Sequence, residues 1–353
     1  MIISSFFMLE STLWFKKNTN IITIVNQILG FKCKIIVVII YTSLLYTLMS
    51  AYIFAYDKWL KKIISSHFYN KNIEIICFLF FFLLTMQISL NKEKSIDKLN
   101  YILSLILLAS YIILIFICTP HINTDFLLTF NIKNSFNNLS LIITSFGFCI
   151  VIPNLVVHLN KDSKKILYSI IIGGIIPLII YIIWQITILG IFPINNHDKL
   201  LILNANENNF DIMFIYTLEA EIKKIFLSKY ILLFSIFAIL TSYIGITISL
   251  NSFFYDEFIY HNKPNNIIIF ILTIVPPILI SIYFTSGFTI ILKFSGIFVS
   301  ILLGLLPTII IWYGRYNLNI KGKFTVFGGK PLLLITLLFF LYVIIYNTYI
   351  LLI

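Results

Sequence analysis

Long apolar runs separated by short polar connections make up almost all of this 353-residue chain. A helix needs about 20 apolar residues to cross a bilayer. A shorter apolar run over 1–15 predicts part of one further helix. The pattern therefore predicts an all-α polytopic membrane protein, with a single transmembrane domain over 1–353. About nine runs are long enough for full spans: 32–56, 73–91, 99–119, 137–158, 166–190, 226–251, 265–285, 287–313 and 331–353.

Composition excludes a soluble protein. Apolar residues make up 60% of the chain, charged residues 11%, and the mean hydropathy is +1.01, whereas soluble domains have roughly 45–50% and about 25%. The net charge of +11 does not indicate nucleic-acid binding, because most lysines lie in the connections. We expect no cofactor or metal, since Cys33, Cys77, Cys118 and Cys149 lack the close spacing of zinc ligands. No enzyme motif occurs.

The basic residues predict an orientation. Cytoplasmic connections of membrane proteins carry an excess of Lys and Arg. We therefore expect the more basic side to be cytoplasmic and the C-terminus to face outward. The connection 191–225 becomes an outer loop, with a possible surface helix over 212–225. The basic residues on the cytoplasmic side are Lys16, Lys17, Lys32, Lys34, Lys92, Lys94, Lys98, Lys161, Lys164, Lys165, Lys263, Arg315, Lys321, Lys323 and Lys330.

One predicted span, 137–158, contains helix-breaking residues. It carries Thr144-Ser145-Phe146-Gly147-Phe148 followed by Pro153, and leaves the membrane through the polar segment 160–165. The next span carries Gly173-Gly174 and Pro177. Irregular backbone at membrane depth is tolerated only where protein or a water-filled cavity surrounds it. Transporters bind solutes at such breaks, so the segment predicts a solute carrier.

These residues resemble a known family. The run 144–148, Pro153, the basic turn and a following set of matches are similar to bacterial aromatic amino-acid permeases, the tyrosine- and tryptophan-specific branch of the hydroxy and aromatic amino-acid permease family. The resemblance continues, in order, over nearly the whole chain. Its further residues are Leu48 to Ile53, Pro120-His121-Ile122, Gly173, Ile176-Pro177-Leu178, Tyr181, Trp184-Gln185, Leu189-Gly190, Thr241 to Gly245, Pro276-Pro277, Gly287-Phe288, Gly296, Pro307 and Gly328 to Pro331.

The resemblance implies a LeuT-type inverted-repeat transporter fold in a bacterial inner membrane. It implies uptake of tyrosine or tryptophan by proton symport, with alternating access. Met8-Leu9-Glu10 aligns with the end of the family's second helix, so we expect an N-terminally incomplete fold. A non-transporting, truncated remnant is the alternative function. Cys149-Ile150 stands where relatives have His-Gly, and Ser252 stands where they have Asp.

Phe146, Gly147 and Phe148 are the leading substrate-binding candidates. Unwound backbone there can bind the amino or carboxylate group of an amino acid, while the rings pack on its side chain. Alternatively, Gly147 only permits close helix packing. The hydroxyls of Thr144 and Ser145 can donate to the unwound turn, or can bond to their own preceding carbonyls.

Further candidates lie on other spans. Tyr52 can reach a substrate carboxylate, although tyrosine is also common at membrane interfaces. Thr241 and Ser242 carry hydroxyls on a span that we expect to face the centre. Glu10 and Lys293 are the charges nearest to membrane depth, where an ionisable residue suggests function. We expect Lys293 to extend its amine to the surface.

Overall fold

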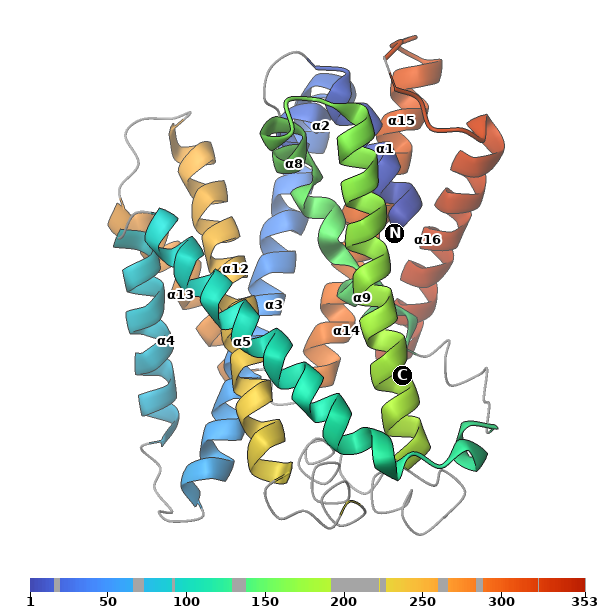
Figure 1. The fold of residues 1–353 in the computed structure, drawn as a ribbon. Helices are drawn as coiled ribbons and strands as arrows, with labels where there is room; N and C mark the ends of the chain where they lie inside the picture. Colours follow the sequence, from blue (N-terminus) through green and yellow to red (C-terminus); the bar gives the residue numbers. More distant parts are fainter. Residues whose placement is uncertain are drawn as a thin grey trace. The chain divides into compact units, whose positions relative to one another are not determined.

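The structure is a computed structural model, and the residues it describes are all helical, turn or loop, with no strand among them. Contacts divide the chain into two compact units, which are described separately below. Figure 1 shows the helices of both. The described residues are 1–15, 20–65, 73–90, 93–128, 138–191, 222, 227–259, 266–283, 288–322 and 324–352.

Unit 1 comprises residues 1–44, 131–181 and 292–353. Helix α1 lies at its centre and packs against α2, α8 and α15 and against the short segments η3 and η5. The elements lying wholly or partly in unit 1 are α1 (Ile2–Leu13), α2 (Ile21–Leu29), α3 (Phe31–Ser65), α7 (Leu139–Ser145), η3 (Gly147–Val151), α8 (Ile152–His158), α9 (Ser163–Ile191), α14 (Phe288–Val299), η5 (Ser300–Leu305), α15 (Leu306–Tyr316) and α16 (Gly329–Leu352).

Unit 2 comprises residues 45–130 and 182–291. Its helices α4, α5, α12 and α13 pack side by side, with α12 in contact with each of the other three. The remainder of α3 and of α9 also belongs to it. Its own elements are α4 (Ile73–Leu90), α5 (Glu93–Cys118), η1 (Thr119–His121), η2 (Thr124–Leu128), α12 (Leu227–Ile259) and α13 (Asn266–Tyr283).

The predicted all-α polytopic membrane protein is confirmed. Among the described residues, eight helices are long and apolar enough to cross a membrane. The run predicted over 73–91 forms α4, whose apolar part, Leu79–Ile88, is shorter than a span. The outer loop predicted over 191–225 lies almost entirely outside the described residues. The eight helices are 31–59, 98–121, 139–158, 163–191, 230–255, 266–283, 290–316 and 329–351.

One correction concerns the connection that follows α1. The lysines at 16, 17, 32 and 34 predict one connecting loop between two apolar runs, whereas the structure forms α2 there. The Asn20 side chain begins this helix by accepting a hydrogen bond from the Thr23 N–H at 2.8 Å, and Gly30 ends it at φ 87°. An Asn cap, a positive-φ glycine and apolar residues at helical spacing are ordinary helix signals. The apolar face is buried and contains Ile21, Ile22, Ile24, Val25 and Ile28.

A second correction concerns the run predicted as one helix over 287–313. The structure interrupts it with η5, a π-helical turn. Pro307 follows directly, and proline has no N–H to donate to the residue four positions earlier. A π-turn changes the local hydrogen-bond register and is often found at functional sites. Unit 1 therefore contains a second interrupted span.

Candidate substrate-binding site

The predicted break in the span 139–158 is present in unit 1. Helix α7 ends at Ser145, Phe146 leaves the helical region with φ −107° and ψ 28°, and η3 continues as a 3₁₀ turn. Helix α8 then begins at Ile152, with Pro153 as its second residue. Because Pro153 has no N–H, the Cys149 carbonyl loses its usual partner, and the backbone N–H of Ile152 bonds to it instead. Six residues, 146–151, thus separate two short α-helices at the predicted position.

The hydroxyls before the break bond to their own helix. Thr144 donates from Oγ1 to the Ser140 carbonyl at 2.8 Å, and Ser145 donates from Oγ to the Ile142 carbonyl at 2.7 Å. This is the second of the two arrangements that the sequence left open. Each hydroxyl oxygen keeps lone pairs that can accept a bond from an ammonium group.

Tyr181 of α9 contacts the break from the neighbouring span. Its hydroxyl donates to the Ser145 carbonyl at 3.3 Å. Its ring meets the Phe146 ring edge to face, with centroids 5.4 Å apart. Tyr181 therefore contacts both the last carbonyl of α7 and the first aromatic ring of the break. The sequence analysis includes Tyr181 only as part of the family resemblance and assigns it no role.

Phe148 and Gly147 face other elements of unit 1. A Cβ atom on Gly174 of α9 would lie 3.3 Å from the Phe148 ring and 3.1 Å from Ile2 of α1, so Gly174 makes room for both side chains. A Cβ on Gly147 would lie 3.8 Å from a Leu303 methyl of η5, which is an ordinary contact distance. The 3₁₀ turn of one span therefore packs on the π-turn of another.

The remaining candidates belong to unit 2. Tyr52 lies on α3 and is partly buried, and Thr241 and Ser242 lie on α12. Thr241 donates to the Phe237 and Ala238 carbonyls, at 3.0 and 3.1 Å. Rings connect the two helices through α4. Phe81 meets Tyr56 of α3 at 4.9 Å and Tyr243 of α12 at 4.4 Å, measured between ring centroids.

Glu10 has a partner that the sequence did not predict. Its carboxylate is fully buried in α1 and accepts both N–H groups of the Arg315 fork from α15, with Nε to Oε1 at 2.7 Å and Nη2 bonded to Oε2. The Val326 N–H also donates to Oε2 at 2.8 Å. The two side chains are 305 positions apart, and no local spacing rule relates them. The sequence signal was limited to residue type: Glu10 is the one acid in the apolar run 1–15, and Arg315 follows the apolar run 287–313.

The turn between α8 and α9 is built from the polar segment 160–165. Asn160 and Lys161 adopt φ values of 50° and 62°, which reverse the chain. The Lys165 N–H, and next its ammonium charge, hold the pKa of the exposed Asp162 carboxyl below its usual value. Among the residues that the structure describes, no cluster of His, Cys, Asp and Glu could hold a metal.

The fold and the break define the class of protein. Within the described parts of the chain, eight helices are long enough to cross a membrane, and one of them changes to a 3₁₀ turn between Ser145 and Ile152. This arrangement is typical of a multi-pass membrane carrier. Residues 1–347 match the tryptophan/tyrosine permease family, and the chain belongs to that family. It is therefore a permease for a small molecule and not an enzyme.

Individual relatives carry different substrate names. The chain is 26% identical to tyrosine-specific transport system 1 of Haemophilus influenzae, over 91% of its own length and 79% of the relative's. It is 26% identical to a low affinity tryptophan permease of Escherichia coli O157:H7, over 96% and 83%. It is also 27% identical to glutamine transporter 2 of Aliivibrio fischeri, over 90% and 80%.

Proposed function

We propose that this permease takes up an aromatic amino acid, tyrosine or tryptophan, across a bacterial inner membrane. The transport cycle is alternating access on a LeuT-type inverted-repeat fold, driven by proton symport. Membership in the tryptophan/tyrosine permease family supports the substrate class. The observation that carries the proposal is the break at Phe146-Gly147-Phe148, where α-helical pairing changes to a 3₁₀ turn beside two aromatic rings.

The chemistry of the break fits an aromatic amino acid. Amide and carbonyl groups at a change of helical pairing suit the carboxylate and the ammonium group of the substrate. Phe146 and Phe148 offer ring faces and edges to its side chain. Phe146 already makes an edge-to-face contact with Tyr181, so the local environment accepts aromatic stacking. Thr144 and Ser145 add hydroxyl oxygens beside the same turn.

Glutamine is the second candidate substrate, because one relative of similar coverage is a glutamine transporter. An amide side chain would need polar partners, whereas the break presents two phenyl rings. We therefore favour the aromatic substrates. Tyr52, Thr241 and Ser242 remain predicted substrate contacts in unit 2.

Uptake into cells that lack their own aromatic amino-acid carriers tests the proposal. We expect cells expressing this chain to accumulate radiolabelled tyrosine or tryptophan. Gly147→Leu should abolish that uptake while the protein still inserts, since the larger side chain fills the turn. Gly147→Ala should retain part of it, because a Cβ fits at an ordinary distance from Leu303.

Gly173→Leu is the matched control for that experiment. Gly173 lies on α9 in the same unit, is exposed, and has no atom within 4 Å of an added Cβ. The Gly173→Leu variant should transport like the wild type. If inserted wild-type protein accumulates neither aromatic amino acid, the substrate assignment is wrong. Wild-type uptake by Gly147→Leu would show that the break is not the binding site.

A further inference from the structure

Helix α1 touches both interrupted spans of unit 1. It packs against η3 and α8 of the first and against η5 and α15 of the second. Near its N-terminal end, Ile2 lies beside Phe148 and Gly174. Helix α1 has 12 residues and is therefore about 18 Å long. It reaches from Phe148 in the break to Arg315 near the C-terminal end of α15.

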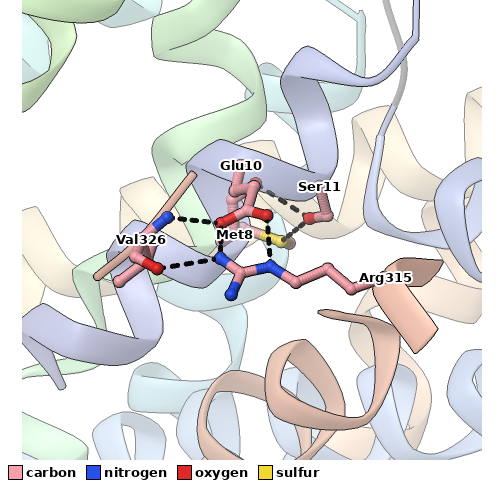
Figure 2. Close-up of polar contacts among 5 residues, drawn as sticks. All are labelled: Met8, Glu10, Ser11, Arg315 and Val326. Atoms are coloured by element: carbon pink, nitrogen blue, oxygen red, sulfur yellow. Dashed lines mark hydrogen bonds and ion pairs between the residues drawn. The ribbon is translucent and has the colours of Figure 1, made fainter. Parts of the chain in front are cut away.

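The C-terminal end of α1 is held by two cations from different elements. Arg315 of α15 pairs with Glu10 through two hydrogen bonds and also donates to the Val326 carbonyl at 3.1 Å. Lys161, in the turn after α8, donates from Nζ to the Phe15 carbonyl at 3.0 Å. Figure 2 shows the guanidinium nitrogens pointing at the two Glu10 carboxylate oxygens, with Val326 beside both. We call Glu10, Arg315 and Lys161 the α1 clamp.

The Glu10–Arg315 pair fixes the orientation of α1 in addition to any contribution to stability. Glu10 is fully buried and the Arg315 side chain is 14% exposed, so both charges have lost most of their water. Apolar residues of similar size often pack such a position at least as stably as an ion pair. A bidentate Arg–carboxylate pair adds something that apolar packing lacks, because its two parallel bonds fix one relative orientation of the groups.

We infer that Glu10 and Arg315 are positioning residues for transport, which fix α1 in register along both interrupted spans. This inference rests on the proposed function. With the pair formed, α1 is held against η3, where Cys149 lies fully buried beside Ser5 of α1. Loosening the pair lets α1 shift, exposes Cys149, and lets the two interrupted spans move out of step during the transport cycle.

Alkylation of Cys149 measures the position of α1 without any transport assay. Cys33, Cys77 and Cys118 are replaced by Ala, and the rate of reaction with N-ethylmaleimide is measured in membranes. We expect Glu10→Gln and Arg315→Lys to react at least tenfold faster than the parent. Arg315→Lys is informative because it keeps the positive charge and loses the fork.

The matched control is Asp162→Asn, which removes an exposed ion pair of the same unit. Asp162 and Lys165 lie 3.5 Å apart with side chains 41% and 73% exposed. The control should react at the parent rate. Equal alkylation rates in the parent and both clamp variants would overturn the positioning role.

Uptake kinetics test whether positioning matters for transport. At equal abundance of inserted protein, we expect both clamp variants to lose at least tenfold in maximal rate, with KM within about twofold of the wild type. The double variant Glu10→Leu/Arg315→Met removes both charges together, so it should insert and still transport slowly. Wild-type rates in this double variant would mean that the pair only stabilises the fold, and would overturn the inference.

The two proposals fail in different ways. If the wild type accumulates no aromatic amino acid, the proposed substrate is wrong, and the alkylation rates still decide whether the clamp positions α1. If the wild type transports and the clamp variants match it in maximal rate, the proposed function stands and the inference fails.

Discussion

At the scale of single residues, side chains from one helix donate hydrogen bonds to backbone carbonyls that lack a helical partner in another helix. Pro276 has no N–H for the Leu272 carbonyl four residues earlier, and the Tyr46 hydroxyl of α3 donates to that carbonyl at 2.8 Å. Tyr181 makes the corresponding bond at Ser145. In lipid no water can replace these partners. Tyrosine is thus used in each unit as a long-range backbone donor.

Tyr181→Phe tests this use of tyrosine at the break. The substitution keeps the ring, and with it the Phe146 contact, while removing the hydroxyl that bonds Ser145. We expect substrate affinity to fall about three- to tenfold, because the freed carbonyl can turn away from the site, at a cost of about 1 kcal/mol. Equilibrium binding of labelled tyrosine to purified protein measures the loss. An unchanged dissociation constant would mean that the bond does not support the site.

Tyr46→Phe should instead reduce stability. It leaves the Leu272 carbonyl unpaired inside unit 2, and we expect a loss of about 1–3 kcal/mol. Thermal unfolding in detergent measures it. Tyr283→Phe is the control, because Tyr283 lies on the same helix α13 and is 80% exposed. Equal melting temperatures for the two variants would contradict the assigned role of Tyr46.

At the scale of elements, close helix packing through glycine organises the interrupted spans. A Cβ on Gly296 of α14 would lie 2.5 Å from the Ser140 carbonyl oxygen of α7, which is far inside contact distance. Gly304 of η5 similarly accommodates the Phe340 ring of α16. Small residues allow helices to approach closely in membranes, where dispersion contacts replace the hydrophobic effect. These glycines bring α14 close to α7 and the π-turn close to α16.

Gly296→Ala should therefore destabilise unit 1. The added methyl group collides with backbone, which cannot move aside as a side chain can, and overpacking of this kind costs about 1–3 kcal/mol or more. We expect less folded protein and a lower melting temperature. Gly245→Ala on α12 is the control, because nothing lies within 4 Å of its added Cβ. A wild-type melting temperature for Gly296→Ala would contradict the close approach of α7 and α14.

The sequence predicted some elements well because their cause is local. Gly147 and Pro153 both weaken helical pairing locally, so the interruption of 137–158 could be predicted from the sequence. Helix α2 was missed although its Asn20 and Gly30 signals are local, because the flanking lysines favoured a loop. The π-turn at 300–305 could not be predicted, since Pro307 is equally suited to the first turn of a helix. The Glu10–Arg315 pair depends on tertiary packing alone.

At the scale of the whole molecule, family membership and an unwound span together indicate amino-acid transport. The chain belongs to the tryptophan/tyrosine permease family, and the binding site at the break is our proposal. The relatives differ in the substrates for which they are named. The substrate class and the driving ion are therefore the two properties of this permease that most need measurement.

Transport by purified protein in liposomes tests this central claim most directly. Initial rates of labelled tyrosine and tryptophan uptake are measured with the interior alkaline, without sodium, and with excess unlabelled glutamine outside. We predict uptake of at least one aromatic amino acid that requires the proton gradient, is not reduced by glutamine, and disappears in Gly147→Leu but not in Gly173→Leu. Loss of this uptake in the presence of glutamine, or uptake of neither aromatic amino acid, would contradict this substrate assignment.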